Sequence, residues 1–274
     1  MLKEVIRAVF RHAGYEVRRL TKEHVPRRAY PFVWQATLAG VRFRYWVKDD
    51  VAEEWYVSEE HEMMIEDRVL AGLVKPGDRV LEVGCHQGFY LSFLGKLVGP
   101  RGFVLGVDIN PENVMIAQSQ LVLNGLTAWC EVLNRAASAS AAEELGYTDS
   151  TNSMVVVLEE KKRGTTQTTT VDKLCLDYGD FDLLMVDVEG FEEEVLKGAS
   201  GLLDRRRPKL AVEIHSDNLQ RYGSTLASLA SAGRFSHYAG TMILRSVDRN
   251  RVLPFEPEAL PTMGISSVFL ECVR

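Results

Sequence analysis

The chain has 274 residues, 46% of them apolar, with a formal net charge of −6 and a pI near 5.6. This length and apolar content predict one main α/β domain with additions rather than two equal domains. The net negative charge argues against a nucleic-acid partner, because a phosphate backbone is bound by Lys and Arg side chains. We expect a cytoplasmic protein, since no apolar run could cross a bilayer and no apolar signal segment opens the sequence. The four cysteines are scattered without a CxxC pair, which predicts reduced thiols rather than a zinc site.

The N-terminal part separates into a basic and an acidic stretch. Residues 1–28 combine basic side chains with apolar residues at helical spacing. That pattern indicates either a helix capping the domain, which we favour, or contact with an anionic membrane surface. The acidic stretch from Asp49 to Glu62 is expected to be a solvated helix face. We therefore predict a helical and β extension with a cap over 1–64, and the main domain over 65–274.

Strand and helix patterns then alternate to the end of the chain. Predicted strands cover residues 78–84, 102–108, 128–134, 181–190, 208–215, about 235–247 and 266–273. Predicted helices cover 88–98, 111–124, 190–204 and 217–232. A polar insertion at 135–153 precedes β segments at 154–160 and 165–171, which flank a Lys-Lys-Arg-Gly turn. The alternation predicts a Rossmann-like three-layer sandwich, with a mostly parallel seven-stranded sheet and an antiparallel strand near the C-terminus.

The first of these strands runs into the stretch VLEVGCHQGFY, which places Glu82, Gly84 and Gly88 where ligands bind in such sheets. A dinucleotide fingerprint needs a further glycine where the backbone approaches a pyrophosphate, and His86 occupies that place. Asp108 ends the second strand, where a carboxylate accepts hydrogen bonds from ribose hydroxyls and disfavours a 2′-phosphate. A ribose without a pyrophosphate indicates S-adenosylmethionine.

These residues resemble the class I S-adenosylmethionine-dependent methyltransferases, whose acidic-GxxxG motif and second acid are matched here. A narrower resemblance is to the FkbM family, through DLLMVDVEGFEEEVLKGA at 182–199. TTTVDKL precedes it at 168–174 and LAVEIH follows at 210–215, so the likeness spans roughly 65–220. The chain departs at the first motif, with Glu-Val-Gly-Cys-His where the family often has Asp-x-Gly-Ala-Asn.

The resemblance implies methylation of a hydroxyl on a sugar, a glycan or a polyketide-like natural product. The acceptor is then a small molecule or a glycan. Together, the motifs and the resemblance predict a cofactor site made by Glu82, Gly84, Cys85, His86, Gly88, Asp108, Ile109, Asn134, Ala136 and Asp187.

An independent check comes from strand geometry. Glu213 and His215 are two residues apart and share one face of their strand. Asp187 and Glu189 end the preceding strand and should face the same crevice. We expect an in-line displacement in which His215 accepts the hydroxyl proton and Glu213 orients the imidazole or the acceptor. A structural or substrate-orienting role for His215 stays open.

Asp187, Glu213 and His215 also have the ligand types that a divalent cation accepts. Glu189 has a simpler explanation, because acids favour the N-terminus of the helix that follows. We therefore expect no metal. His61 and Glu189 are candidate substrate contacts, although His61 also fits an exposed helix position.

Two other functional classes remain open at this point. One is a NAD-dependent oxidoreductase, which the missing glycine and the FkbM-like turn disfavour. The other is a catalytically silent binding module that keeps the fold. Base amino-methylation is disfavoured, because the fourth strand lacks the Asn/Asp-Pro-Pro-aromatic signature. The acceptor's identity and the oligomeric state do not follow from the sequence.

Overall fold

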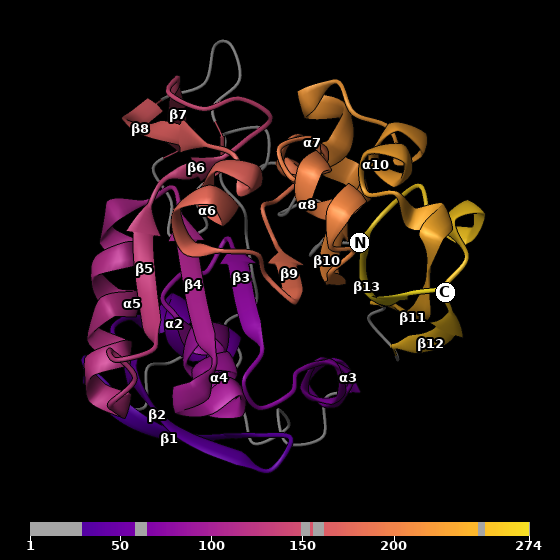
Figure 1. Cartoon of the computed structure of the whole chain (residues 1–274). Helices are drawn as coiled ribbons and strands as arrows, with labels where there is room; N and C mark the ends of the chain where they lie inside the picture. Colours follow the sequence, from indigo (N-terminus) through magenta and orange to yellow (C-terminus); the bar gives the residue numbers. More distant parts are fainter. Residues whose placement is uncertain (1–28, 58–64, 149–153, 156–161, 246–249, 274) are drawn as a thin grey trace, which may run out of the picture.

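The computed structural model describes residues 29–57, 65–148, 154–155, 162–245 and 250–273 (Figure 1). Its main sheet has the strand order β12-β11-β13-β10-β9-β3-β4-β5. These strands are β3 (Arg79–Val83), β4 (Phe103–Asp108), β5 (Cys130–Asn134), β9 (Leu183–Val186), β10 (Lys209–His215), β11 (Tyr238–Leu244), β12 (Arg251–Pro254) and β13 (Ile265–Cys272). Strands β5, β4, β3, β9 and β10 are mutually parallel, whereas β13 is antiparallel to β10 and β11.

The predicted α/β class and mostly parallel sheet are confirmed, but the sheet has eight strands in the described part of the chain rather than seven. The additional strand is β12, which pairs antiparallel with the edge of β11. Its four residues are too few to give a strong alternation signal, so the sequence pattern did not reveal it.

Helices cover both faces of the sheet, as the alternation predicted (Figure 1). They are α3 (Ile65–Leu73), α4 (Phe89–Val98), α5 (Pro111–Asn124), α6 (Val171–Tyr178), α7 (Glu192–Lys197), α8 (Ser200–Arg205), α9 (Ser216–Leu219) and α10 (Leu226–Ala232). Helix α5 has its predicted bounds, because Asn110 caps its first turn and Gly125 ends it in the left-handed conformation. Within the described residues, no helix combines the length and apolar character needed to cross a membrane.

Two segments that were predicted as single helices are each divided into two helices in the structure. The segment 190–204 is divided into α7 and α8 at Gly198, which lies against the carbonyl oxygen of Ser138, where a Cβ would stand 2.1 Å away. The segment 217–232 is divided into α9 and α10, with Gly223 in the left-handed region between them. Both interruptions depend on local glycine geometry that helical periodicity does not record.

The polar insertion forms a small sheet of its own. Strands β6 (Ala136–Ala137), β8 (Lys162–Thr169) and β7 (Glu144–Thr148) pair in that order. The predicted Lys-Lys-Arg-Gly turn was wrong, because residues 162–164 belong to β8 and pair with β7. Gly164 fits there because the Tyr147 ring covers it, leaving 2.7 Å between a would-be Cβ and the hydroxyl. The predicted strand at 154–160 lies largely outside the described residues.

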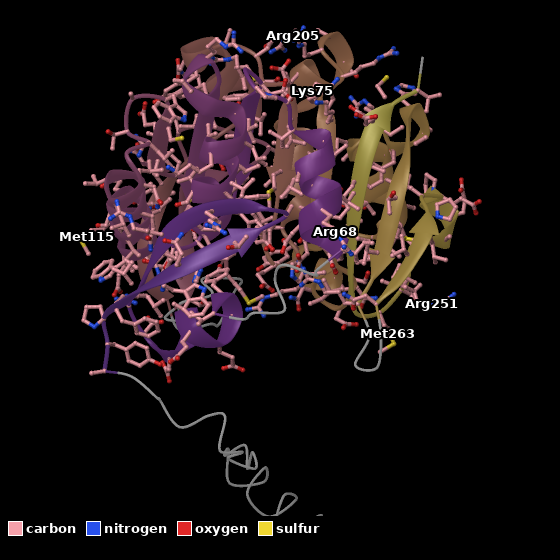
Figure 2. All side chains as sticks on the ribbon, turned by 90° about the horizontal axis from the view of Figure 1, so that it is seen from below. Arg68, Lys75, Met115, Arg205, Arg251 and Met263 are labelled. Carbon is pink, nitrogen blue, oxygen red and sulfur yellow. The ribbon has the colours of Figure 1, made fainter. Side chains whose placement is uncertain are left out.

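The extension contributes a hairpin and a short helix to the domain. They are β1 (Phe32–Leu38), β2 (Val41–Val47) and α2 (Asp50–Tyr56). Figure 2 shows α3, marked by Arg68, between this hairpin and the C-terminal strands. The basic stretch 1–28 and His61 lie outside the described residues, and the boundary at residue 64 stays a prediction.

Two amide side chains of α5 attach the hairpin to the domain. Asn124 accepts a hydrogen bond from the backbone N–H of Arg44 at 2.8 Å and donates one to its carbonyl at 2.7 Å. Gln120 makes the same pair of bonds with Trp46, both at 2.9 Å. The amides therefore replace a neighbouring strand along the free edge of β2.

We predict that Asn124→Ala lowers the free energy of unfolding by about 1–3 kcal/mol, because polar groups of Arg44 lose their partners. Urea denaturation monitored by circular dichroism measures this change. Val122→Ala is the matched control, because Val122 lies on the same helix with 70% of its surface exposed. Its effect should stay within about 0.5 kcal/mol. Equal stabilities for the two variants would show that the amide contacts do not hold the hairpin.

Candidate active site

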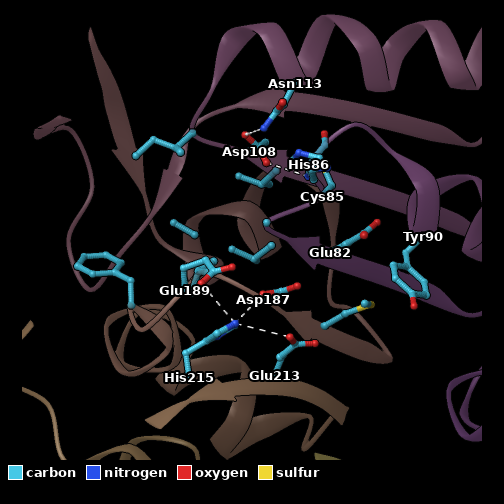
Figure 3. Close-up of a pocket in the computed structure, with 18 of the residues that line it drawn as sticks. Glu82, Cys85, His86, Tyr90, Asp108, Asn113, Asp187, Glu189, Glu213 and His215 are labelled. Carbon is cyan, nitrogen blue, oxygen red and sulfur yellow. Dashed lines mark hydrogen bonds and ion pairs between the residues drawn. The ribbon is translucent and has the colours of Figure 1, made fainter. Parts of the chain in front are cut away.

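A cavity of about 510 Å³ opens at the carboxyl ends of β3, β4, β9 and β10 (Figure 3). Its walls come from the loop after β3, the end of β4, the turn after β9 and the end of β10. Helix α2 and the residues around β11 add to it. This volume is typical of sites that enclose a small molecule. The cavity therefore lies where the strand order predicted a ligand.

The two glycines of the loop after β3 serve close packing. Gly84 has a φ of 87°, and a Cβ on it would stand 1.7 Å from the carbonyl oxygen of Asp187. Gly88 has a φ of 78° and lies against Ala117 of α5, where a Cβ would be 2.8 Å from its Cα. Gly84 lines the cavity, whereas Gly88 lies behind it as the residue that precedes α4.

Asp108 anchors this loop from the end of β4. Its carboxylate accepts hydrogen bonds from the backbone N–H groups of His86 and Asn110, both at 2.8 Å, and from the Asn113 amide at 3.3 Å. Burial raises the pKa of Asp108 to about 6, although these three bonds favour the charged form. The residue thus holds the loop and faces the cavity at the same time.

Glu82 is a buried acid whose carboxyl group is suited to bind a ligand. It lines the cavity, and one of its carboxyl oxygens, Oε2, has no hydrogen-bond partner among the described residues. Burial, reinforced by Asp187 and Asp108, raises the pKa of Glu82 well above its ordinary value. A ligand with O–H or N–H donors would satisfy this oxygen. S-adenosylmethionine has such donors in its ribose and its amino group.

The other predicted cofactor residues divide into two groups. Cys85, Ile109 and Ala136 line the cavity, and burial raises the pKa of the Cys85 thiol well above its usual value. Asn134 does not line it. Its amide donates to the carbonyls of Asp108 and Ile109 at 3.0 and 2.9 Å and accepts from Thr166. Asn134 therefore braces the end of β4 from behind the wall.

His215 is surrounded by carboxylates, as the strand geometry predicted (Figure 3). Its Nδ1 lies 2.9 Å from Glu192 Oε1 in a hydrogen bond. Its Nε2 lies 3.5 Å from Glu189, 3.6 Å from Glu213 and 3.9 Å from Asp187, measured to a carboxylate oxygen of each. We call these five residues the histidine–carboxylate cluster.

Burial and the neighbouring acids have opposite effects on the charge of His215. Burial disfavours the charged imidazole, but the bond with Glu192 and the charges of Asp187 and Glu189 outweigh it and raise the pKa of His215 to about 9. Burial and Glu213 raise the pKa of Asp187 well above its ordinary value. The raised pKa favours the imidazolium form of His215 near neutral pH.

Glu189 reaches the imidazole from a constrained turn. Its φ of 58° lies in the left-handed region, which costs a non-glycine residue roughly 1 kcal/mol or more. Gly190 follows with a φ of 106° and packs on Asn218, where a Cβ would be 2.5 Å from the Asn218 Cβ. The packing of Gly190 on Asn218 limits the movement of this turn and so helps to fix the direction of the Glu189 carboxylate.

Sequence reasoning missed several residues of the cavity wall, including a charged one and three aromatic ones. Arg245 follows β11 and binds both oxygens of Glu213, at 2.8 and 2.7 Å. Trp55 and Tyr56 end α2, and Tyr90 lies in α4. The only signal for Trp55 and Tyr56 was two adjacent aromatics in an acidic stretch interpreted as a solvated face.

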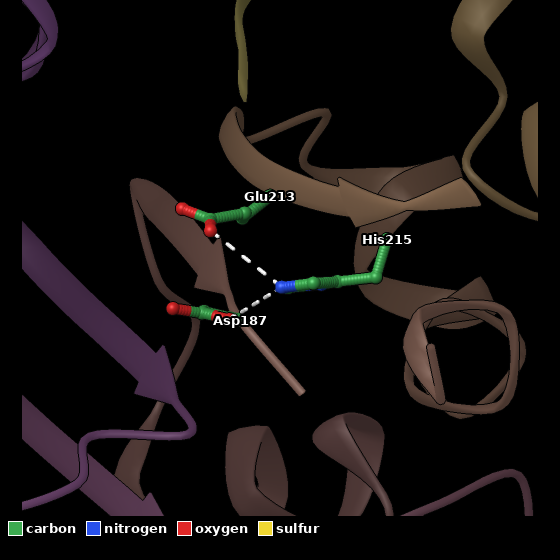
Figure 4. Close-up of side chains that lie close together, drawn as sticks. All are labelled: Asp187, Glu213 and His215. Atoms are coloured by element: carbon green, nitrogen blue, oxygen red, sulfur yellow. Dashed lines mark ion pairs between the residues drawn. The ribbon is translucent and has the colours of Figure 1, made fainter. Parts of the chain in front are cut away.

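Figure 4 shows how closely Asp187, Glu213 and His215 approach one another. One ligand atom from each lies within 4.8 Å of the others, which is compact enough for a divalent cation. Arg245 and the imidazolium already supply positive charge against these carboxylates. The positive charges of Arg245 and His215 therefore offset part of the negative charge of these carboxylates.

The profile of the Methyltransferase FkbM domain matches residues 82–236. Ribosomal RNA large subunit methyltransferase E of Syntrophobacter fumaroxidans is 38% identical over 55 residues, covering 18% of this chain and 28% of that protein. Protein-L-isoaspartate O-methyltransferase of Fervidobacterium nodosum is 38% identical over 53 residues, covering 19% and 27%. The matched stretches thus span just over a quarter of either relative.

Among solved structures, methyltransferase FkbM from Methylobacillus flagellatus KT has a TM-score of 0.43 and 15% identity, covering 77% of this chain and 52% of that chain. The family match at 82–236 spans more than half of the chain and includes the whole histidine–carboxylate cluster as well as Glu82 and Asp108. The chain therefore belongs to the FkbM methyltransferase family.

Proposed function

We propose that the protein methylates a hydroxyl group of a sugar, a glycan or a polyketide-like natural product, with His215 accepting the hydroxyl proton. The observation that carries this proposal is the position of the histidine–carboxylate cluster. It shares one cavity with Asp108 and Glu82, the two acids suited to hold the cofactor.

The cofactor end of the cavity is formed by β3 and β4. Asp108 would accept hydrogen bonds from the ribose, and Glu82 would bind further donors through its unpartnered oxygen. Ile109 and Ala136 give this end an apolar wall suited to adenine. When bound, S-adenosylmethionine supplies a methyl group activated by a positive sulfonium.

His215 must lose a proton before it can accept one from a hydroxyl. The bond between Nδ1 and Glu192 fixes the ring so that Nε2 points toward Asp187, Glu189 and Glu213. A cation bound in the cavity disfavours the imidazolium and lowers the pKa of His215. The free protein thus uses the imidazolium to neutralise its carboxylates, and the neutral imidazole forms when a cationic cofactor binds.

The acceptor end favours a neutral hydroxyl compound. Three carboxylates, those of Asp187, Glu189 and Glu213, face Arg245 and His215 there. This balance disfavours a phosphate-rich acceptor such as RNA. The arrangement also gives Glu213 a fixed orientation, because both its oxygens bind Arg245. The cytoplasmic location inferred from the sequence stays a prediction.

We predict that Asp108→Ala weakens binding of S-adenosylmethionine and S-adenosylhomocysteine by about 1.5–3 kcal/mol, because charge-assisted hydrogen bonds to the ribose are lost. Isothermal calorimetry measures this change, with NAD expected to bind far more weakly to the unaltered protein. Asp177→Ala is the control, because Asp177 forms an exposed ion pair with Lys173 away from the cavity. Unchanged affinity in Asp108→Ala would reject the ribose assignment.

We expect methyl transfer to survive EDTA, because Arg245 and His215 already balance the charge of Asp187 and Glu213. The assay compares turnover before chelation, after it and after addition of magnesium or zinc. Loss of activity on chelation and its return with either metal would reassign the trio in Figure 4 as metal ligands.

We predict that His215→Ala retains cofactor affinity but loses about 100- to 10,000-fold in turnover, whereas His61→Ala costs less. Because the neutral imidazole accumulates as pH rises, kcat/KM should increase up to about pH 9, the pKa of His215 in the free protein. The acid limb of the pH dependence of kcat should lie at a lower pH than that of kcat/KM, because the positively charged cofactor lowers the pKa of His215 when it is bound.

The same shift can be measured without an acceptor by NMR titration of the imidazole. S-adenosylmethionine should lower the pKa of His215 more than S-adenosylhomocysteine does, because S-adenosylhomocysteine lacks the positive charge on sulfur. Near wild-type turnover in His215→Ala, with the acid limb in place, would instead assign the proton to Glu213 or His61.

A further inference from the structure

We propose that Trp55 and Tyr56 form an aromatic wall that binds the positively charged middle of the cofactor and positions the loop at His86. Both residues line the cavity, and both precede the segment that the family profile matches. The inference rests on S-adenosylmethionine as the cofactor and concerns how this chain's own extension completes the site.

Tyr56 is held firmly against the cofactor loop. Its hydroxyl oxygen lies 2.8 Å from His86 Nδ1 in a hydrogen bond. Its ring stacks on Phe89 with centroids 4.5 Å apart and meets the edge of Tyr45 at 5.3 Å. Trp55 adds a second ring 5.2 Å from the imidazole of His86 and is 41% exposed at the rim. The imidazole therefore contacts both aromatic side chains of α2.

His86 needs such support because its backbone is left-handed. Its φ of 47° is a conformation that glycine adopts more readily than histidine. The backbone N–H of His86 donates to Asp108, so a shift of His86 would move a hydrogen-bond donor away from that carboxylate. Tyr56 is thus a positioning residue for the ribose end of the site.

The wall lines the same cavity as Asp108 and His215. Beyond the effect of burial and Tyr45, the charges of Asp187 and Glu82 reach the Tyr56 hydroxyl and help to raise its pKa well above the ordinary value. His86 connects the wall to Asp108 on the other side. A ligand that extends from Asp108 to His215 therefore shares its cavity with these two rings.

In S-adenosylmethionine the sulfonium lies in the middle of the molecule, between the ribose and the amino-acid chain. Aromatic faces attract cations, and Glu82 and Asp187 add negative charge nearby. S-adenosylhomocysteine has the same shape but a neutral sulfur. An aromatic wall that binds the sulfonium should therefore favour the charged ligand over the neutral one, whereas a purely structural wall would not.

The test compares the affinities of both ligands for the full chain and its variants by calorimetry. Trp55→Leu should weaken S-adenosylmethionine about 2- to 30-fold more than S-adenosylhomocysteine, and Trp55→Phe should restore most of this preference. Tyr56→Phe should weaken both ligands by a similar factor, because it loosens the loop and keeps the ring. Trp129→Phe is the control, since Trp129 donates to the Gly95 carbonyl away from the cavity.

Intrinsic fluorescence gives a second readout that does not require Trp55→Leu to fold well. S-adenosylmethionine should change the emission of the unaltered chain, and this change should be largely lost in Trp55→Phe. Equal effects of Trp55→Leu on both ligands, or an unchanged fluorescence response in Trp55→Phe, would overturn the aromatic wall. Failure of the unaltered chain to bind either ligand would instead overturn the cofactor site as a whole.

Discussion

The close approach of Gly84 to the Asp187 carbonyl oxygen joins the two halves of the active site. Any side chain at position 84 would start 1.7 Å from that oxygen, so the loop after β3 would have to move away from the turn after β9. The backbone N–H of Asp187 donates to the carbonyl of Val83 at 2.9 Å, so a hydrogen bond also joins these two segments. Asp108 and His215 can face one cavity only because these two chain segments touch.

Charge balance is the second constraint on the site. Glu192 is fully buried and binds Nδ1 of His215, so the imidazole is held from behind by one carboxylate and faces three others. A neutral imidazole in this position would remove a positive charge that faces Asp187 and Glu189. The histidine–carboxylate cluster is therefore best balanced with a cation present, either the imidazolium itself or a positively charged ligand. Under the proposed mechanism, binding of the cofactor would therefore be accompanied by the loss of a proton.

Much of the site was predictable from local rules. The two-residue period of a strand predicted that Glu213 and His215 share a face, and the parallel order placed Asp187 beside them. Position 86 was identified as an exception to a glycine pattern, and the structure shows that His86 keeps a glycine-like backbone there.

The residues that escaped prediction depend on contacts between distant segments. Arg245 reaches Glu213 because β11 pairs with β13 and β13 with β10, a register that no motif encodes. Trp55 and Tyr56 reach the cavity because the hairpin before them docks on α5. Lys162 belongs to a strand only because β7 supplies its partner. In each case, long-range pairing outweighed the local signal.

The docking of β2 on α5 also bears on the behaviour of the protein in a crowded solution. A free strand edge offers unpaired N–H and C=O groups that can recruit a strand from another molecule. On β2 these groups are already bound at Arg44 and Trp46 by the amides of Asn124 and Gln120. Side chains of a helix thus close an edge that a further strand would otherwise extend, which guards this apolar hairpin against intermolecular aggregation.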